Sequence, residues 1–151
     1  MKNTFILFTL VFAIVACKQK KESAKVLEAK PVNIIIGTWK MVYADIQEGD
    51  SLQIKDLSKS EFVKIINKTH FSFFNQGYTD PSLFYGGGGT YKLENNTYTE
   101  KLQFTSIDAI RDHEFPFTIE FKKDTLIQYG LEEVESANIK RYILEKYIRI
   151  K

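Results

Sequence analysis

The feature that most constrains the fold of this chain is a strict alternation of apolar and polar residues between positions 115 and 122. The apolar members are Phe115, Phe117, Ile119 and Phe121, and the polar or ring-constrained members between them are Pro116, Thr118, Glu120 and Lys122. Successive side chains of a strand point to opposite faces, so this segment predicts a β-strand with one apolar face. Such a strand needs further strands to complete a stable sheet.

Seven other segments carry strand signals, and short turn signals such as Asn95-Asn96 and Lys123-Asp124 separate several of them. They are 34–43, 62–66, 69–76, 86–93, 97–104, 125–129 and 139–150. Residues 105–114 are expected to be a polar connection and residues 131–138 an acidic loop. No segment has a strong helical pattern, and at most one short helix is expected, within 44–61, where Leu52, Ile54 and Leu57 would support it. The prediction is an all-β fold, a small up-and-down antiparallel barrel of about eight strands. An open sandwich is the alternative.

The composition limits the classes of function. The chain has 151 residues, 21 Lys and Arg against 19 Asp and Glu, and a net charge of +2, which gives no argument for nucleic-acid binding. A single Cys excludes an intramolecular disulfide. Aromatic residues make up 14% of the chain, which suits a sheet protein with a large apolar interior. We expect one domain after a leader, a monomer and no cofactor.

The leader has the features of a bacterial export signal. A positive start, Met1-Lys2-Asn3, precedes an apolar run from Thr4 to Ala16, which is too short to span a membrane. The run ends in Ile14-Val15-Ala16-Cys17, which resembles the lipobox of bacterial lipoproteins. The resemblance implies cleavage before Cys17 and lipidation of that residue, whose acyl chains would hold the protein on a membrane. The alternative is an ordinary signal peptide followed by a free Cys.

These features divide the chain into three parts. Residues 1–16 are expected to be the signal peptide, 17–31 a lipidated polar tether, and 32–151 the barrel domain. In Gram-negative lipoproteins an Asp after the lipidated Cys commonly retains the protein at the inner membrane, whereas Lys18 stands there in this chain. The resemblance therefore implies a cell-envelope protein anchored to the outer membrane.

The first strand segment, 34–43, contains the only Trp of the chain. Alternation places Trp39, Met41 and Tyr43 on one face, and Gly37 allows close approach of another group. Gly37-Thr38-Trp39 resembles the Gly-x-Trp signature of the calycin superfamily, which comprises lipocalins and fatty-acid-binding proteins. Further stretches resemble bacterial lipocalin-like domains of unassigned function: Phe71-Ser72-Phe73, Gly89-Thr90-Tyr91-Lys92-Leu93 and Asn96-Thr97-Tyr98-Thr99-Glu100.

The resemblance implies a lipocalin-like barrel in which a basic residue near the chain end covers the Trp. Arg149 and Arg141 are the two candidates, and the contact would be a cation–π interaction. The Arg-x-Tyr pair of fatty-acid-binding proteins is absent, because Arg141 is followed by Tyr142 and Ile143. The resemblance therefore does not extend to capture of a carboxylate by that pair.

The candidate ligand-binding residues lie on the more apolar face of each strand. In an antiparallel barrel alternate residues point inward, so this face is expected to line the interior. They are Trp39, Met41, Phe71, Phe73, Tyr91, Tyr98, Glu100, Phe117 and Ile119, with Arg141 from the closing strand. Glu100 shares its expected face with Tyr98, Leu102 and Phe104. A carboxylate there needs a partner. It either contacts a polar group of a ligand or pairs internally with Arg141 or another base.

Two other motifs are expected to be structural. Gly86-Gly87-Gly88-Gly89 lacks the Lys and Ser/Thr of a phosphate loop, so a barrel bend or a close backbone approach is the favoured interpretation. Asp112-His113-Glu114 holds three possible ligands, but neighbours in an extended chain point opposite ways, so no metal site is expected.

Three hypotheses about function follow from these residues. The first is a barrel that binds a small apolar or amphipathic molecule. The second is a structural or protein-interaction lipoprotein whose barrel is filled by its own side chains. The third is a small enzyme that uses Glu100 with Tyr91 or Tyr98, although no catalytic spacing is recognisable. An empty interior favours the first hypothesis over the second.

Overall fold

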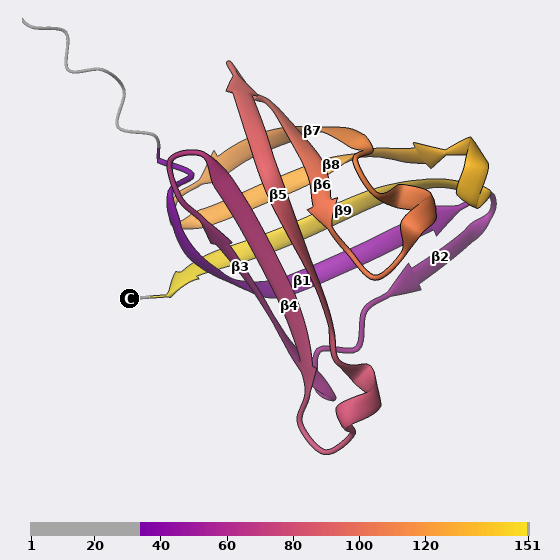
Figure 1. The fold of residues 1–151 in the computed structure, drawn as a ribbon. Coiled ribbons are helices and arrows are strands. Elements are labelled where there is room, and N and C mark those ends of the chain that lie inside the picture. Colours follow the sequence, from indigo (N-terminus) through magenta and orange to yellow (C-terminus); the bar gives the residue numbers. More distant parts are fainter. Residues whose placement is uncertain (1–33, 151) are drawn as a thin grey trace, which may run out of the picture. The chain divides into compact units, whose positions relative to one another are not determined.

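The computed structural model describes residues 34–150, which fold into nine antiparallel strands (Figure 1). The strands are β1 (Gly37–Glu48), β2 (Ser51–Ile54), β3 (Ser60–Ile66), β4 (His70–Gly77), β5 (Tyr85–Glu94), β6 (Thr97–Phe104), β7 (Glu114–Lys122), β8 (Thr125–Val134) and β9 (Ile139–Ile150). The expected signal peptide, the expected lipidation site Cys17 and the expected tether lie outside the described residues.

Eight of these strands close into an up-and-down barrel. From β3 to β9 each strand pairs with its neighbours in sequence, β1 pairs with β3, and β1 also pairs with β9 to complete the circle. The prediction of an all-β barrel is confirmed, and the open-sandwich alternative is wrong because β1 and β9 are hydrogen-bonded along most of their length. Closure gives each of the eight strands a paired neighbour on both sides over at least part of its length.

The predicted short helix within 44–61 is wrong. β1 continues to Glu48, turns at Gly49 with a positive φ of 56°, and returns as β2, which pairs with Asp45–Glu48. β3 pairs with β1 only through Gly37–Lys40, so the far half of β1 has a free edge that β2 occupies. Backbone pairing along this edge decides the structure here, and Leu52 and Ile54 are left exposed.

Most predicted turns lie where the sequence placed them. Asn95 and Lys123 have positive φ values of 57° and 56° at the β5–β6 and β7–β8 hairpins. The helical elements of the described chain are three single 3-10 turns, η1 (Pro81–Leu83), η2 (Asp108–Ile110) and η3 (Glu135–Ala137). No helix in this part of the chain is long and apolar enough to cross a membrane.

The predicted acidic loop 131–138 is wrong over its first half, because β8 runs on to Val134. Residues 131–134 pair with 139–142 of β9, and Val134 is buried while Glu133 is exposed. Cross-strand hydrogen bonds therefore extend a strand through three residues, Leu131, Glu132 and Glu133, whose composition suggested a loop.

One end of the barrel is filled by its own side chains. The fully buried residues that form this filled end are Ile35, Trp39, Ile66, Tyr98, Leu126 and Tyr147. The described chain starts and finishes at this end, where β1 begins and β9 ends (Figure 1). The three 3-10 turns lie toward the other end, which we call the mouth.

Trp39 is fixed by contacts with both termini of the described chain. Its indole Nε1 donates a 2.7 Å hydrogen bond to the carbonyl oxygen of Ile35, and the guanidinium of Arg149 lies 4.2 Å from its ring centroid. Arg149 also donates to the carbonyl oxygens of Ile34 and Ile36 at 2.6 Å. Gly37 has a φ of 155°, and a Cβ there would overlap the Arg149 guanidinium. Of the two candidate arginines, Arg149 is therefore the one that covers Trp39, and it also occupies the space beside Gly37.

Two register shifts change which side chains point inward. Between Met41 and Tyr43 the pairing of β1 with β9 slips, so Ala44 is buried and Tyr43 does not follow Trp39 and Met41 into the core. Between Gly88 and Gly89 the pairing of β5 with β6 slips, and Phe104 is 67% exposed. The expected inward positions of Tyr43 and Phe104 are both wrong, because a bulge inserts one residue and reverses the alternation beyond it.

Gly89 explains part of the run of four glycines. A Cβ at Gly89 would overlap the backbone carbonyl oxygen of Lys101 on β6, which approaches at the bulge. Gly89 is buried, and its strand continues through the glycines without a helix start. The geometry agrees with the favoured interpretation of the run as a site of close backbone approach.

Candidate ligand cavity

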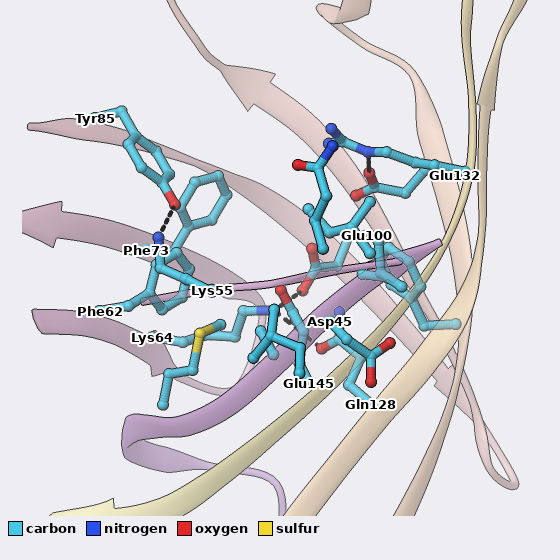
Figure 2. A pocket seen from close by; sticks show the side chains of 18 residues that line it. Asp45, Lys55, Phe62, Lys64, Phe73, Tyr85, Glu100, Gln128, Glu132 and Glu145 are labelled. Atoms are coloured by element: carbon cyan, nitrogen blue, oxygen red, sulfur yellow. Dashed lines mark hydrogen bonds and ion pairs between the residues drawn. The ribbon is translucent and has the colours of Figure 1, made fainter. Parts of the chain in front are cut away.

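The barrel interior is hollow toward the mouth. A cavity of about 380 Å³ lies there, and a neighbouring one of about 240 Å³ shares part of its wall. The first cavity is lined by apolar side chains of several strands and by a group of charged and amide side chains (Figure 2). The aliphatic and phenylalanine side chains of the lining are Met41, Ala44, Ile46, Ile54, Phe62, Phe73, Phe117 and Ile143. Both volumes are close to the lower range of natural small-molecule sites.

The floor of the cavity is a buried polar cluster centred on Lys64 of β3. Its Nζ lies 2.8 Å from Oε1 of Glu100 on β6 and donates a 2.9 Å hydrogen bond to Oε1 of Gln128 on β8. The Lys64 and Glu100 side chains are 3% and 8% exposed. Figure 2 shows the three side chains converging from different strands. A buried ion pair of this kind is stable only while both partners are present.

Aromatic rings surround the other side of the Lys64 ammonium. Its Nζ is 5.4 Å from the ring centroid of Tyr147, 5.9 Å from that of Tyr98 and 6.0 Å from that of Phe71. Ring faces carry negative potential and attract a cation at these distances. Lys64 therefore lies between the filled end of the barrel and the cavity. Its charge is satisfied by Glu100 and Gln128 on one side and by the aromatic rings on the other.

Glu145 of β9 is a second carboxyl on the cavity wall, next to Lys64. Its Oε2 accepts a 2.6 Å hydrogen bond from the hydroxyl of Tyr147, which lies on the same strand. Barrel atoms surround the Glu145 side chain, but the side chain is partly accessible to solvent because it faces the open cavity. Burial raises the pKa of Glu145, and the Glu100 and Glu132 carboxylates add to this, while Lys64 and the Tyr147 hydrogen bond oppose it.

A second ion pair lies nearer the mouth. Arg141 of β9 donates from Nε to Oε2 of Glu132 on β8 at 2.6 Å, and both side chains line both cavities. On the opposite wall, Lys55 Nζ donates a 3.0 Å hydrogen bond to the Tyr85 hydroxyl (Figure 2). Charged side chains therefore stand at the entrance as well as on the floor.

The second cavity lies under the connection between β6 and β7. Residues 105–107 and Ile110 cover it, and Phe115, Phe117 and Ile139 line its apolar side. β7 pairs with β8 only from Thr118 onward, so these two strands separate toward the mouth and leave this space between them. The two cavities share lining residues, among them Phe73, Glu100 and Phe117.

The candidate residues from the sequence fall into two groups. Five line a cavity, namely Met41, Phe73, Glu100, Phe117 and Arg141. Five others belong to the packing of the filled end, namely Trp39, Phe71, Tyr91, Tyr98 and Ile119, and none of these lines either cavity. The partner of Glu100 is Lys64, and Arg141 pairs with Glu132 instead.

Three polar residues of the site, Lys64, Gln128 and Glu145, are absent from the sequence-derived candidates. A signal existed for two of them. Lys64 stands between Phe62 and Ile66 on the apolar face of its strand, and Gln128 stands two positions after Leu126. A polar residue on an apolar face is a candidate interior group. Glu145 gave no such signal, because its strand has mixed residues on both faces.

The tyrosines proposed with Glu100 for acid–base chemistry are placed differently. The Tyr91 hydroxyl donates to the carbonyl oxygen of Asn67 at 2.7 Å. The buried Tyr98 hydroxyl has no hydrogen bond of good geometry within the described chain, and burial together with the nearby Glu100 carboxylate raises the pKa of Tyr98 far above its ordinary value. Within residues 34–150 no group of three or more His, Cys, Asp or Glu side chains is arranged to hold a metal ion.

Residues 34–151 match a family described as a domain of unknown function, DUF4488. The match covers the whole barrel. No curated protein matches the chain.

Proposed function

The chain belongs to the DUF4488 family, and we propose that its barrel binds a small amphipathic molecule in the cavity at the mouth. The observation that carries this proposal is the hollow half of the barrel. Its walls are apolar, but its floor holds hydrogen-bonding groups around Lys64 and Glu145. An apolar chamber with a few convergent polar groups is the usual form of a small-molecule site.

The lining has two chemically distinct zones. Phe62 and Phe73 stack with ring centroids 5.6 Å apart on one wall, and Phe117 and Ile143 lie on others. These surfaces suit the apolar body of a ligand. The Gln128 amide and the Glu145 carboxyl suit a polar group that reaches the floor. A purely apolar ligand would leave the floor without partners, so one polar end is part of the proposal.

Exposed apolar side chains near the entrance support entry of such a molecule. Ile54 and Phe84 are 64% and 59% exposed, and Tyr85 and Ile107, which line the cavities, are also exposed. Apolar surface at an entrance lowers the cost of moving an apolar body out of water.

A cavity-filling variant tests the proposal. Ala44 is buried on the cavity wall, and Ala44→Phe would occupy the space a ligand needs. Val42→Phe is the matched control, because Val42 on the same strand is 44% exposed. Binding of N-phenyl-naphthylamine, a neutral apolar fluorophore, is measured by its emission. We expect binding to the wild type and to Val42→Phe, and a loss of at least about tenfold for Ala44→Phe.

Circular dichroism and thermal unfolding establish that each variant is folded. Ala44→Met fills less of the cavity and replaces Ala44→Phe if the larger ring prevents folding. Equal probe affinity in the wild type and a folded filling variant would contradict binding in this cavity. Native mass spectrometry of the protein purified from its own host tests the same proposal directly, because a retained ligand adds mass.

We further propose that the barrel acts as an envelope lipoprotein, monomeric and anchored to the outer membrane through lipid on Cys17. The support is the order of charge, apolar run, small residue and Cys in the leader, together with Lys18. The proposed role is binding rather than catalysis, within a lipocalin-like barrel.

A further inference from the structure

We propose that the cavity selects ligands with a positively charged head, a protonated primary amine on an apolar body, and that Glu145 is its counter-charge. This inference rests on the proposed binding function and names the class of ligand. It is carried by the arrangement of charges around the first cavity, where the Glu145 carboxyl has no ion-pair partner among residues 34–150.

The charges that line the first cavity do not balance. Four carboxyl groups and three cationic groups contribute to its wall. Within the barrel, Lys64 pairs with Glu100 and Arg141 pairs with Glu132, which leaves Glu145 without an ion-pair partner in the described chain. The remaining two, Asp45 and Lys55, each form a hydrogen bond with a tyrosine, Tyr43 and Tyr85 respectively.

The position of Glu145 suits contact with a ligand. One oxygen, Oε2, accepts from Tyr147 and is held by that bond, so the carboxyl is oriented before any ligand arrives. The side chain lines the cavity, so its other oxygen can accept from an ammonium group of a ligand. Lys64 lies close enough to oppose a second cation, but its own charge is already matched by Glu100 at 2.8 Å.

An anionic head would meet a less favourable site. The Lys64 ammonium has Glu100, Gln128 and three aromatic rings around it, and the Arg141 guanidinium is held by Glu132. A carboxylate on the floor would lie beside Glu145 and Glu100 and would have to displace one of these pairs. A cation instead neutralises an enclosed carboxyl and places its apolar body against Phe62 and Phe117.

Ligand charge is coupled to the protonation of Glu145. Burial raises the pKa of Glu145, with Glu100 and Glu132 facing it as further carboxylates and Lys64 and the Tyr147 hydroxyl as opposing groups. In the empty barrel the carboxyl therefore holds its proton to a higher pH than an ordinary Glu, and an ammonium takes the place of that proton. Affinity for an amine is expected to rise as the pH increases from acidic toward neutral, whereas affinity for an alcohol is not.

Three ligands that share one chain and differ only in the head test the inference: decylamine, decanol and decanoate. Each is titrated against bound N-phenyl-naphthylamine on the full chain. We expect decylamine to displace the probe at a concentration at least about tenfold lower than decanol. Glu145→Gln keeps the size and the hydrogen bond to Tyr147 and removes the charge, so the preference for the amine is expected to disappear.

Glu133→Gln is the matched control, because Glu133 lies on β8 outside the barrel and pairs with Lys140. It is expected to leave the preference unchanged. If decanol or decanoate equals or exceeds decylamine in the wild type, or if Glu145→Gln keeps the preference, the inference is wrong while the proposed binding function stands. If neither the probe nor any of the three ligands binds, both are wrong.

Discussion

Lys64 and Glu100 form an ion pair inside the barrel, with the Lys64 Nζ 2.8 Å from the Glu100 Oε1. They are 36 residues apart and belong to β3 and β6, which are not paired with each other. The contact therefore crosses the interior rather than running along a ladder. It marks the level at which packed side chains give way to an open cavity.

Removing one member of this pair is expected to destabilise the barrel strongly. Lys64→Met leaves the Glu100 carboxylate enclosed without its cation, which costs about 3–5 kcal/mol in the free energy of unfolding. Urea unfolding measures this value. Lys40→Met is the control, because Lys40 forms an exposed pair with Glu61 and its loss should cost less than about 1 kcal/mol.

The double variant Lys64→Met with Glu100→Leu separates the pair from the packing. With both charges removed, the loss is expected to be smaller than for Lys64→Met alone, because no unpaired ion remains. Additive losses in the two single variants and the double variant would show that the two side chains act independently.

Glu145 predicts a pH dependence of stability. Its pKa in the folded chain is raised above the ordinary value of 4.5, so the folded state keeps a proton that the unfolded state releases. The contribution of Glu145 to the free energy of unfolding is therefore fully present below the ordinary pKa of 4.5 and is lost as the pH rises through the folded-state pKa. As the pH rises from the ordinary pKa to the folded-state pKa, the wild type should lose free energy of unfolding relative to Glu145→Gln, as measured by urea unfolding at each pH. A constant difference between the two across the pH range would contradict the raised pKa.

Trp39 and Arg149 are expected to stabilise the filled end together. Trp39→Ala removes a ring that is 1% exposed and should cost about 3–5 kcal/mol, as measured by denaturant unfolding. Arg149→Met keeps an apolar stem but loses the cation–π contact and the bonds to two carbonyls, so a cost of about 1–3 kcal/mol is expected. A loss below about 1 kcal/mol for Trp39→Ala would mean that the ring is not part of the core.

Gly89→Ala tests the close approach of β5 and β6. The added methyl group would overlap the Lys101 carbonyl oxygen, and because this is a backbone atom the strands must separate. We expect a cost of about 1–3 kcal/mol in thermal unfolding. Thr90→Ala, at the next position, should cost markedly less. Equal effects of the two substitutions would remove the steric explanation for glycine at this position.

Cys17→Ala tests the proposed anchor. The variant should be released from membranes or remain unprocessed, since lipid on Cys17 is the proposed attachment. Cell fractionation and the mass of the mature chain measure both effects, and Cys17→Ala is compared with a Ser23→Ala variant that leaves the lipobox intact. Mature Cys17→Ala protein that still fractionates with membranes would contradict the lipoprotein proposal.

The sequence determined the features of this protein that depend on local chain geometry. Alternation in residues 115–122 and turn residues such as Asn95 and Lys123 fix strands and hairpins through backbone preferences that act over a few positions. An ordered series of eight such strands then predicts the barrel. These local signals do not show which side chains meet across the interior of the barrel.

Tertiary structure alone decided which inward-facing residues fill the barrel and which surround the cavity. The bulges near Val42 and Gln103 reverse the alternation, so Ala44 points inward and Phe104 does not. The meeting of Lys64, Glu100 and Glu145 depends on the register of three strands and on the closure of the sheet. Each strand displays its own pattern locally, but the distance across a closed barrel is set by all the strands together.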